Sequence, residues 1–357
     1  MAFWRLTFTA TLTFGLLFSA GDSYAHGINP LQHKGIIRTI LFGNTRLLDK
    51  LGQPVHETFT SIAYRCHTRI DSCAGSDYEW AETDNRDGIG TLIQGVIWND
   101  DPSLKLLGNL EKKKEWGVFM YDADKIATCH RDKKANCKSI DETYDMLYRS
   151  HYGDLQFLHS MASEDGAEPA VTKGKIMEWA KFAYKVSTGE INKDRTLAEL
   201  ETSGDSLVNT YLNRGSWKVG YLFTRQEKPS VSHVRTVALG SLLHMVQDSF
   251  SDAHVNRVQS CIAMNPTRQQ IIEFHNYAAQ IGDEHKIADK RPVWLKTGSL
   301  ASSNPVWQSA RLIQLSFSGS PWAAVEKVLD TEVFALADAP PHGPAKKATG
   351  GDSSCWL

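Results

Sequence analysis

The sequence predicts a mainly α-helical, single-domain protein with long loops, and three observations support this class. Apolar residues recur at helical spacing in several segments, such as 174–187, 230–248 and 305–317. Residues that typically begin helices stand at the start of two of them, a serine at 230 or 232 and a proline after Asn304. The composition, 41% hydrophobic and 22% charged in 357 residues without a fixed-period repeat, is ordinary for a globular chain with a sizeable core.

Further helices are expected on either side of the central segment. The stretch 196–215 reads as one or two helices that stop at a glycine, and 321–337 follows a second proline. Residues 269–289 also have a helical pattern, with a break near Gly282. Residues 74–96 are rich in Gly, Asp and Asn and predict a loop.

The first 25 residues indicate an export signal. Arg5 supplies a positive start, an apolar run follows, and small residues stand at a cleavage site that ends at Ala25. The apolar run is too short to span a bilayer. We therefore expect a secreted, soluble protein whose mature chain begins at His26, with one domain over 26–337 and an extended tail over 338–357.

The six cysteines form an even set, which in an exported protein favours disulfides over a cysteine metal site. Two pairs would close short loops, Cys66 with Cys73 and Cys129 with Cys137. The third pair would join Cys261 to the tail through Cys355. This pairing is one choice among the fifteen connectivities that six cysteines allow.

The stretch 230–257 contains the strongest site signal. His244 and Asp248 are four residues apart, so a helix places them one turn apart on the same face. An imidazole nitrogen and a carboxylate oxygen directed at one point form a ligand pair that zinc accepts. Gly240 and Ser241, one turn earlier, are small enough to let a neighbouring helix approach closely. We expect the helix to weaken after Asp248, so that His254 lies on the following turn and points to a different place.

The pairing of a histidine with an acid recurs along the chain. His285 and Asp289 are again four residues apart, and His56 begins an amphipathic run that contains His-Glu-Thr. Together with the spacing of the central His, Asp and His, these motifs resemble the zinc-dependent phospholipase C family. The single-strand-specific zinc nucleases share the metal scaffold of that family. The resemblance covers scattered motifs over about residues 26 to 290, not continuous similarity.

The resemblance implies a multi-helix bundle that holds three zinc ions. Carried over residue by residue, it assigns one ion to Asp100, His159, His244 and Asp248. It assigns a second ion to His254, His285 and Asp289. It assigns the third ion to the amino terminus at His26, to His56 and to a bridging Asp248. By the same resemblance, Asp100 would also act as the general base.

Two of these assignments leave alternatives open. Asp100 ends a Trp-Asn-Asp element like the Trp-x-Asp element of the family, with Asp101 as the second choice, although an Asn-Asp-Asp-Pro turn also explains the composition. His159 precedes an acidic loop, as in the nuclease branch, whereas His151 stands in a His-aromatic-x-Asp setting, as in the phospholipase branch. We rank His159 first, and the two histidines could exchange roles.

The resemblance implies a monomeric, secreted phospholipase C that hydrolyses the glycerol-side phosphodiester bond of a phospholipid such as phosphatidylcholine. The formal net charge of -2 provides no strong field for a polyanion, which favours a neutral headgroup at a membrane or micelle surface over nucleic acid. A zinc-dependent single-strand nuclease is the alternative, and a non-enzymatic exported zinc-binding protein is the third hypothesis. The sequence has no GxSxG, GxxxxGK or HExxH motif that would favour another hydrolase design.

Overall fold

The computed structural model describes a mainly helical protein, which confirms the predicted class. It describes residues 55–70, 89–106, most of 118–164, 166–257, 270–277 and 304–337. The predicted export signal and tail lie outside these ranges, so the predicted domain boundaries stay predictions.

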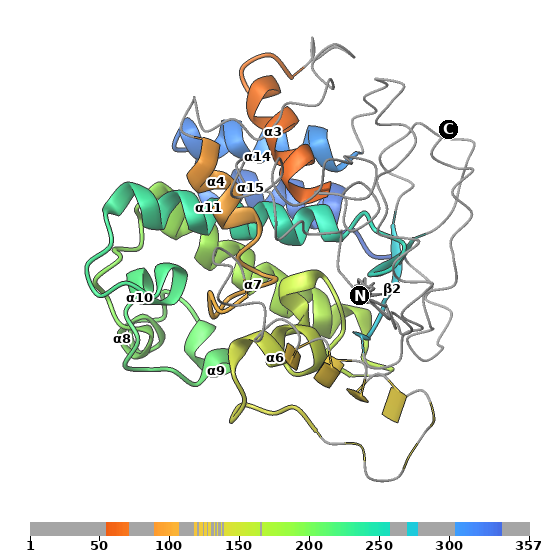
Figure 1. The fold of residues 1–357 in the computed structure, drawn as a ribbon. Coiled ribbons are helices and arrows are strands. Elements are labelled where there is room, and N and C mark those ends of the chain that lie inside the picture. Colours follow the sequence, from red (N-terminus) through yellow and green to blue (C-terminus); the bar gives the residue numbers. More distant parts are fainter. Residues whose placement is uncertain are drawn as a thin grey trace, which may run out of the picture.

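Helix α11 (Val231–Asp248) crosses the middle of the molecule (Figure 1). The hydroxyl of Ser230 caps its first turn by accepting a hydrogen bond from the backbone N–H of His233 at 3.2 Å, as the sequence predicts. Most side chains from Val234 onward are buried. A helix that is buried on nearly every side must be enclosed by other elements, and α11 is therefore the core helix of the fold.

Helices on two sides enclose α11. Helices α3 (Val55–Cys66), α4 (Ile89–Val96) and α14 (Pro305–Phe317) lie on one side of it in Figure 1, and α7 (Pro169–Thr188) lies on the other. The predicted segments 174–187 and 305–317 correspond to α7 and α14. Asn304 caps α14 by accepting from the backbone N–H of Trp307 at 2.8 Å.

The remaining elements are short. They are α6 (Met146–Tyr152), the 3-10 helix η5 (Gln156–His159), α8 (Leu197–Thr202), α9 (Val208–Leu212), α10 (Val219–Thr224), α15 (Trp322–Val328) and the π-helix η8 (Leu329–Val333). Helices α8 and α9 account for the predicted helices in 196–215, and α15 with η8 accounts for most of 321–337. Near the end of the described chain, the backbone of Ala335 and Ala337 binds that of Ile271.

Two predictions of local structure are wrong. Residues 89–96, assigned to a loop, form helix α4, because the apolar side chains of this segment bury against α11 and outweigh its glycines. Residues 271–274, assigned to a helix, form strand β2 (Ile271–Phe274), which pairs antiparallel with β1 (Val255–Arg257). A short apolar run fits either structure, and the partner strand decides between them.

Helices α4 and α11 touch backbone to backbone. A Cβ atom at Gly95 would lie 2.7 Å from the carbonyl oxygen of Val237 and 2.9 Å from the Cα of Gly240. A Cβ atom at Gly240 would in turn meet the backbone of Gly95. This confirms the expected close approach at Gly240, and it brings the turn after α4 to the middle of α11.

Aromatic side chains hold that turn in the core. The ring of Trp98 stacks on Trp179 of α7 with centroids 5.6 Å apart, and it also contacts Phe223 of α10 at 5.3 Å. Both tryptophans are almost completely buried. The turn that follows Trp98 is therefore fixed between α7 and α11.

The described cysteines agree with an exported protein. Cys129 and Cys137 form a disulfide, which confirms that predicted pair. Cys66 is also disulfide-bonded. The other cysteines lie outside the described residues: Cys73, Cys261 and Cys355. Among the helices that the structure describes, none combines the length and the apolar character needed to cross a membrane.

Candidate metal centre

Helix α11 presents His244 and Asp248 one turn apart, as predicted. The Nε2 of His244 lies 2.8 Å from Oδ2 of Asp248, and both side chains are completely buried. The Nδ1 of His244 lies 2.6 Å from the carbonyl oxygen of Val96, at the end of α4. Because a carbonyl oxygen only accepts, Nδ1 carries the proton, and Nε2 turns its lone pair toward the carboxylate.

The turn after α4 brings Asp100 to His244, with Asp100 Oδ2 3.5 Å from His244 Nδ1. Its alternative, Asp101, instead accepts hydrogen bonds from the backbone N–H groups of Lys105 and Leu106, both at 2.8 Å. Asp101 thus stabilises the turn, and Asp100 is the carboxylate that joins the cluster.

His159 stands at the end of η5 and reaches both residues of α11. Its Nδ1 lies 3.0 Å from Asp248 Oδ2 and 3.0 Å from His244 Nε2. Its Nε2 lies 3.1 Å from the carbonyl oxygen of Asn99. Because a carbonyl oxygen only accepts, Nε2 carries the proton and donates the hydrogen bond. The next residue, Ser160, has a φ of 52° and donates to the carbonyl oxygen of Met245 at 2.6 Å, which ties the end of η5 to α11.

His56, at the start of α3, also faces Asp248. Its Nε2 lies 3.1 Å from Asp248 Oδ1, and its ring stacks on that of His244 with centroids 4.0 Å apart. Its Nδ1 lies 2.8 Å from Oε1 of Gln247. His56 is completely buried, so the predicted early histidine belongs to the interior and not to the surface.

His254 follows the end of α11, as expected, and lies beside the cluster. Helix α11 ends at Asp248, and a turn leads to His254 just before β1. This turn folds back, so His254 Nδ1 lies 2.7 Å from the carbonyl oxygen of His159 and 3.6 Å from Asp248 Oδ2. The pairing of β1 with β2 brings the chain back beside the cluster, while His254 belongs to neither of the two compact donor groups of the described residues.

His151 of α6, ranked below His159, lies in the cluster as well. Its ring centroid is 4.8 Å from that of His159, and its Nδ1 lies 2.8 Å from the carbonyl oxygen of Leu147. Its Nε2 lies 4.0 Å from Asp100 Oδ1. That distance is too long for a hydrogen bond. It is somewhat wider than the roughly 3.3 Å that separates two ligands of a tetrahedral zinc ion.

Three imidazole rings direct a nitrogen lone pair at the Asp248 carboxylate. His56, His159 and His244 each place an N–H against a carbonyl or amide oxygen, at 2.8, 3.1 and 2.6 Å. The opposite nitrogen of each ring lies 3.1, 3.0 and 2.8 Å from Asp248. A lone pair and a carboxylate oxygen at such distances repel unless a proton or a metal cation lies between them.

Burial of the histidines favours a metal ion over an additional proton between their lone pairs and the Asp248 carboxylate. It lowers the pKa of His159 and of His244 to about 4, so both rings are neutral at neutral pH. Burial alone would raise the pKa of Asp248, but the surrounding histidines, His244 first, hold it well below its usual range. An ionised carboxylate among neutral imidazoles is the protonation state that binds a metal ion.

The described residues form two compact donor groups, each with ligand atoms within 4.8 Å of one another. One consists of His56, His244 and Asp248, and the other consists of Asp100, His151 and His159. The nitrogen and oxygen donors, their burial and their oriented rings all fit zinc. His159 also lies 3.0 Å from both His244 and Asp248, and Asp100 lies 3.5 Å from His244, so the division of these ligands among individual ions stays a prediction. The metal's identity and the number of three ions stay predictions.

Three predicted ligands lie outside the described residues: His26, His285 and Asp289. Their part in the centre stays a prediction. His275, which the sequence ranks below His285, is described and buried. Its Nδ1 lies 3.1 Å from the carbonyl oxygen of Ala253, and its Nε2 lies 3.7 Å from Glu273.

Sequence reasoning missed the residues that hold the Asp100 turn in place. The side-chain amide of Asn99 donates to the carbonyl oxygens of Leu158 and Ser241, at 2.6 and 3.2 Å, and its oxygen accepts from Ser241 Oγ at 2.6 Å. Trp179 donates to the same Ser241 hydroxyl at 3.1 Å. The sequence marks Ser241 only as a small residue beside Gly240, and its hydrogen bonds to Asn99 and Trp179 were not predicted.

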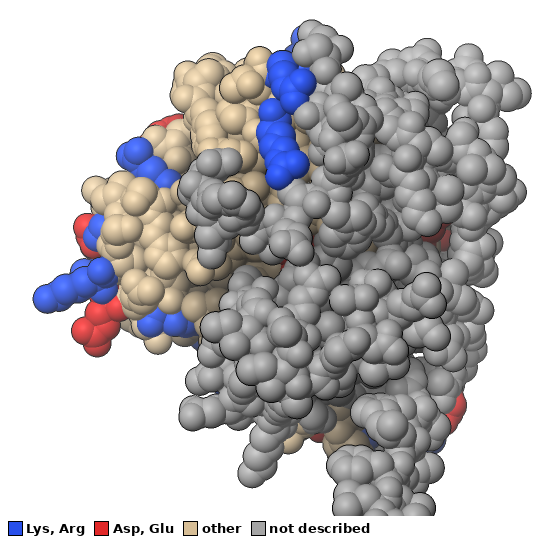
Figure 2. Space-filling model, turned by 45° about the horizontal axis from the view of Figure 1, so that its top comes forward, with Lys and Arg blue, Asp and Glu red and all other residues tan. Residues whose placement is uncertain are grey.

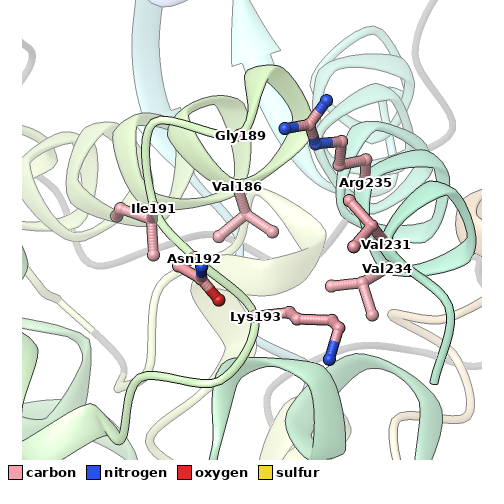
Figure 3. A pocket seen from close by; sticks show the side chains of 8 residues that line it. All are labelled: Val186, Gly189, Ile191, Asn192, Lys193, Val231, Val234 and Arg235. Carbon is pink, nitrogen blue, oxygen red and sulfur yellow. The ribbon is translucent and has the colours of Figure 1, made fainter. Parts of the chain in front are cut away.

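A cavity of about 60 Å³ lies elsewhere and is not part of this centre. Figure 3 shows it between the end of α7, near Gly189, and the first turns of α11, near Val234. With a rise of about 1.5 Å per residue, these turns are roughly 15 Å from His244 along the helix axis.

The assignment of a metal centre is carried by the geometry of the site. Comparisons of the chain with family models, curated proteins and solved structures find no match. The donor set, the burial and the directions of the imidazole rings are the observations on which a function can be proposed.

Proposed function

We propose that this protein is a zinc-dependent phosphoric ester hydrolase, and that it acts as a phospholipase C on a phospholipid. The observation that carries the proposal is the Asp248 carboxylate with the lone pairs of His56, His159 and His244 directed at it. The motif resemblance to the zinc-dependent phospholipases C supports the same reaction.

The chain's own residues would bind and orient the metal ions. His56, His244 and Asp248 would hold one ion, and Asp100 and His151 would help to hold another. His159 stands between the two groups, with its Nδ1 lone pair 3.0 Å from Asp248. Zinc bound there would supply Lewis-acid chemistry to the phosphoryl group and make a water molecule acidic enough to attack it. Because the N–H of each ring is bound to a protein oxygen, the ligands are oriented before substrate arrives.

The substrate phosphate would approach from the end of the cluster formed by Asp100 and His151. These side chains are 5% and 6% exposed, whereas His159, His244 and Asp248 have no exposed surface. At this end, the Asp100 carboxylate would accept a proton from the attacking water. The phosphate would enter past Asp100 and His151, and the inner residues would remain sealed from solvent.

The charge of the molecule favours a neutral headgroup. The net charge is -2, and on the described part of the face in Figure 2 the basic side chains form one short row near the top and are otherwise scattered, with acidic ones near some of them. Binding of a nucleic acid relies on many phosphate contacts with Lys and Arg. Binding of a zwitterionic lipid such as phosphatidylcholine does not require a large group of Lys and Arg side chains.

The proposal is tested on two substrates with one matched pair of variants. The mature protein is incubated with zinc and short-chain phosphatidylcholine, and separately with single-stranded DNA, with and without a chelator. We expect release of phosphocholine that the chelator abolishes. His244→Ala should lose the activity by at least about 100-fold, since a ligand is removed, while His233→Ala, in the first turn of the same helix, should keep it.

Each other outcome contradicts part of the proposal. Release of nucleotides without release of phosphocholine would show that the protein is a single-strand nuclease and not a phospholipase C. Bound zinc without cleavage of either substrate would favour a non-enzymatic zinc-binding protein. Phosphocholine release that survives the chelator would refute the metal-dependent mechanism.

A further inference from the structure

Gln247 is a buried polar side chain of α11 that the proposed chemistry does not use. Its Oε1 accepts a hydrogen bond from His56 Nδ1 at 2.8 Å. Its amide nitrogen donates to Thr60 Oγ1 at 3.0 Å and to Ser309 Oγ at 3.2 Å. Gln247, His56, Thr60 and Ser309 are all completely buried. Gln247 therefore joins the metal centre to α3 on one side and to α14 on the other.

In the structure, the amide nitrogen of Gln247 faces the hydroxyl groups of Thr60 and Ser309. The amide nitrogen carries two N–H groups, and Thr60 and Ser309 each supply an oxygen to accept one. The amide oxygen is then left to face His56. Because this oxygen only accepts, His56 carries its proton on Nδ1, and its Nε2 lone pair faces Asp248 at 3.1 Å.

The geometry points to Gln247 as a positioning residue that fixes the tautomer and the orientation of His56 for binding a metal ion beside Asp248. The inference rests on the metal centre of the proposed function but not on its substrate. A hydrogen bond to the outer nitrogen of a ligating histidine typically changes metal affinity by about 10- to 100-fold. Gln247 would exert this effect from the residue next to Asp248, with Ser309 of α14 holding its amide in place.

The opposite arrangement has a different, observable consequence. If the amide were turned by half a rotation, its nitrogen would donate to His56 Nδ1, and the ring would carry its proton on Nε2. His56 would then form a simple hydrogen bond with Asp248 that needs no metal. The two arrangements differ in which ring nitrogen of His56 is protonated.

Nuclear magnetic resonance of the metal-free mature protein distinguishes them. In long-range proton–nitrogen spectra, we expect the wild-type His56 ring to carry its proton on Nδ1. In Gln247→Met, which keeps the length of the side chain without its polar atoms, we expect a mixture of tautomers. A wild-type ring protonated on Nε2 would overturn the inference, and this result depends on no variant.

Zinc affinity, measured by competition with a chromophoric chelator, provides the second readout. We expect Gln247→Met to bind zinc about 10- to 100-fold more weakly. Gln247→Glu keeps an oxygen that accepts from Nδ1 and should stay closer to wild type than Gln247→Met. Unchanged affinity in Gln247→Met, or equal losses in both variants, would contradict the assigned role.

A double-mutant cycle excludes a role in packing alone. If Gln247 acts through His56, adding Gln247→Met to His56→Ala should cause no further loss of zinc affinity. A further loss as large as in the wild-type background would show that Gln247 only supports the fold. None of these measurements uses a substrate. A protein that behaves as expected here but cleaves no phosphoester would keep the role of Gln247 and refute the hydrolase.

Discussion

At the scale of single residues, the direction of each imidazole N–H decides what the cluster can do. His56, His159 and His244 turn an N–H to a protein oxygen and the other nitrogen to Asp248. Four-residue spacing predicts the contact of His244 with Asp248, because a helix fixes it locally. No local rule gives the partners of the outer nitrogens, which lie on α4, on the turn after it and on α11. The ring directions therefore could not be predicted from the sequence.

Glu57, next to His56 on α3, provides a prediction about pH. Burial raises its pKa to about 7 from 4.5, and its Oε2 has no hydrogen-bond partner among the described residues. Between pH 4.5 and 7 the folded state keeps this proton while the unfolded state loses it, so the group makes folding less favourable as the pH rises. Glu57→Gln removes the effect. We expect the variant to gain up to about 3 kcal/mol over wild type at pH 8 and much less at pH 5.

Urea unfolding of both proteins at the two pH values, with a chelator present, measures this difference. The chelator keeps metal binding out of the comparison. A stability difference of the same size at pH 5 and pH 8 would show that Glu57 does not titrate with a raised pKa. A less stable variant at pH 8 would mean that the carboxylate is needed in its ionised form.

At the scale of elements, the contact between α4 and α11 places Asp100 beside His244. Gly95 and Gly240 make this contact possible. We expect Gly240→Ala to lower the free energy of unfolding by about 2 kcal/mol or more, because the new Cβ meets the backbone of Gly95 and neither helix can move freely. The variant should also bind zinc more weakly, since Val96 and Asp100 move with α4.

Gly174→Ala is the matched control. Gly174 lies within α7, and a Cβ atom there would meet nothing within 4 Å. The same substitution should stabilise the protein by about 0.5 to 1 kcal/mol through the helix preference of alanine. Thermal unfolding of both variants tests the pair. Equal stability of Gly240→Ala and wild type would show that the two helices are not in backbone contact.

The elements also show where sequence patterns are sufficient. Helix α11 was predicted because its apolar spacing and its serine cap are local signals. Helix α4 was missed because its glycines and the composition of the residues before it are typical of a loop. Its eight residues are helical because they are buried against α11. Strand β2 was taken for a helix because its partner β1 lies across a long connection. Pairing between distant segments cannot be recognised from the sequence of either segment alone.

At the scale of the whole molecule, the centre forms because segments far apart in the chain meet around α11. His56, Asp100 and His159 come from three separate stretches, and the resemblance to the zinc-dependent phospholipases C was needed to select them in advance. The mainly helical class followed from composition and periodicity, which are properties of the whole chain. The inclusion of His151, and the grouping of the ligands into two sets, required the packing of α6 beside η5.

The metal content of the purified mature protein tests the central claim most directly. Wild type and His233→Ala should retain zinc after dialysis, measured by mass spectrometry of the metal, and zinc-edge X-ray absorption should show nitrogen and oxygen ligands at about 2.0 to 2.2 Å without sulfur. His244→Ala and Asp248→Ala should each lose bound zinc. A wild-type protein without metal, or the same zinc content in all four proteins, would contradict the account.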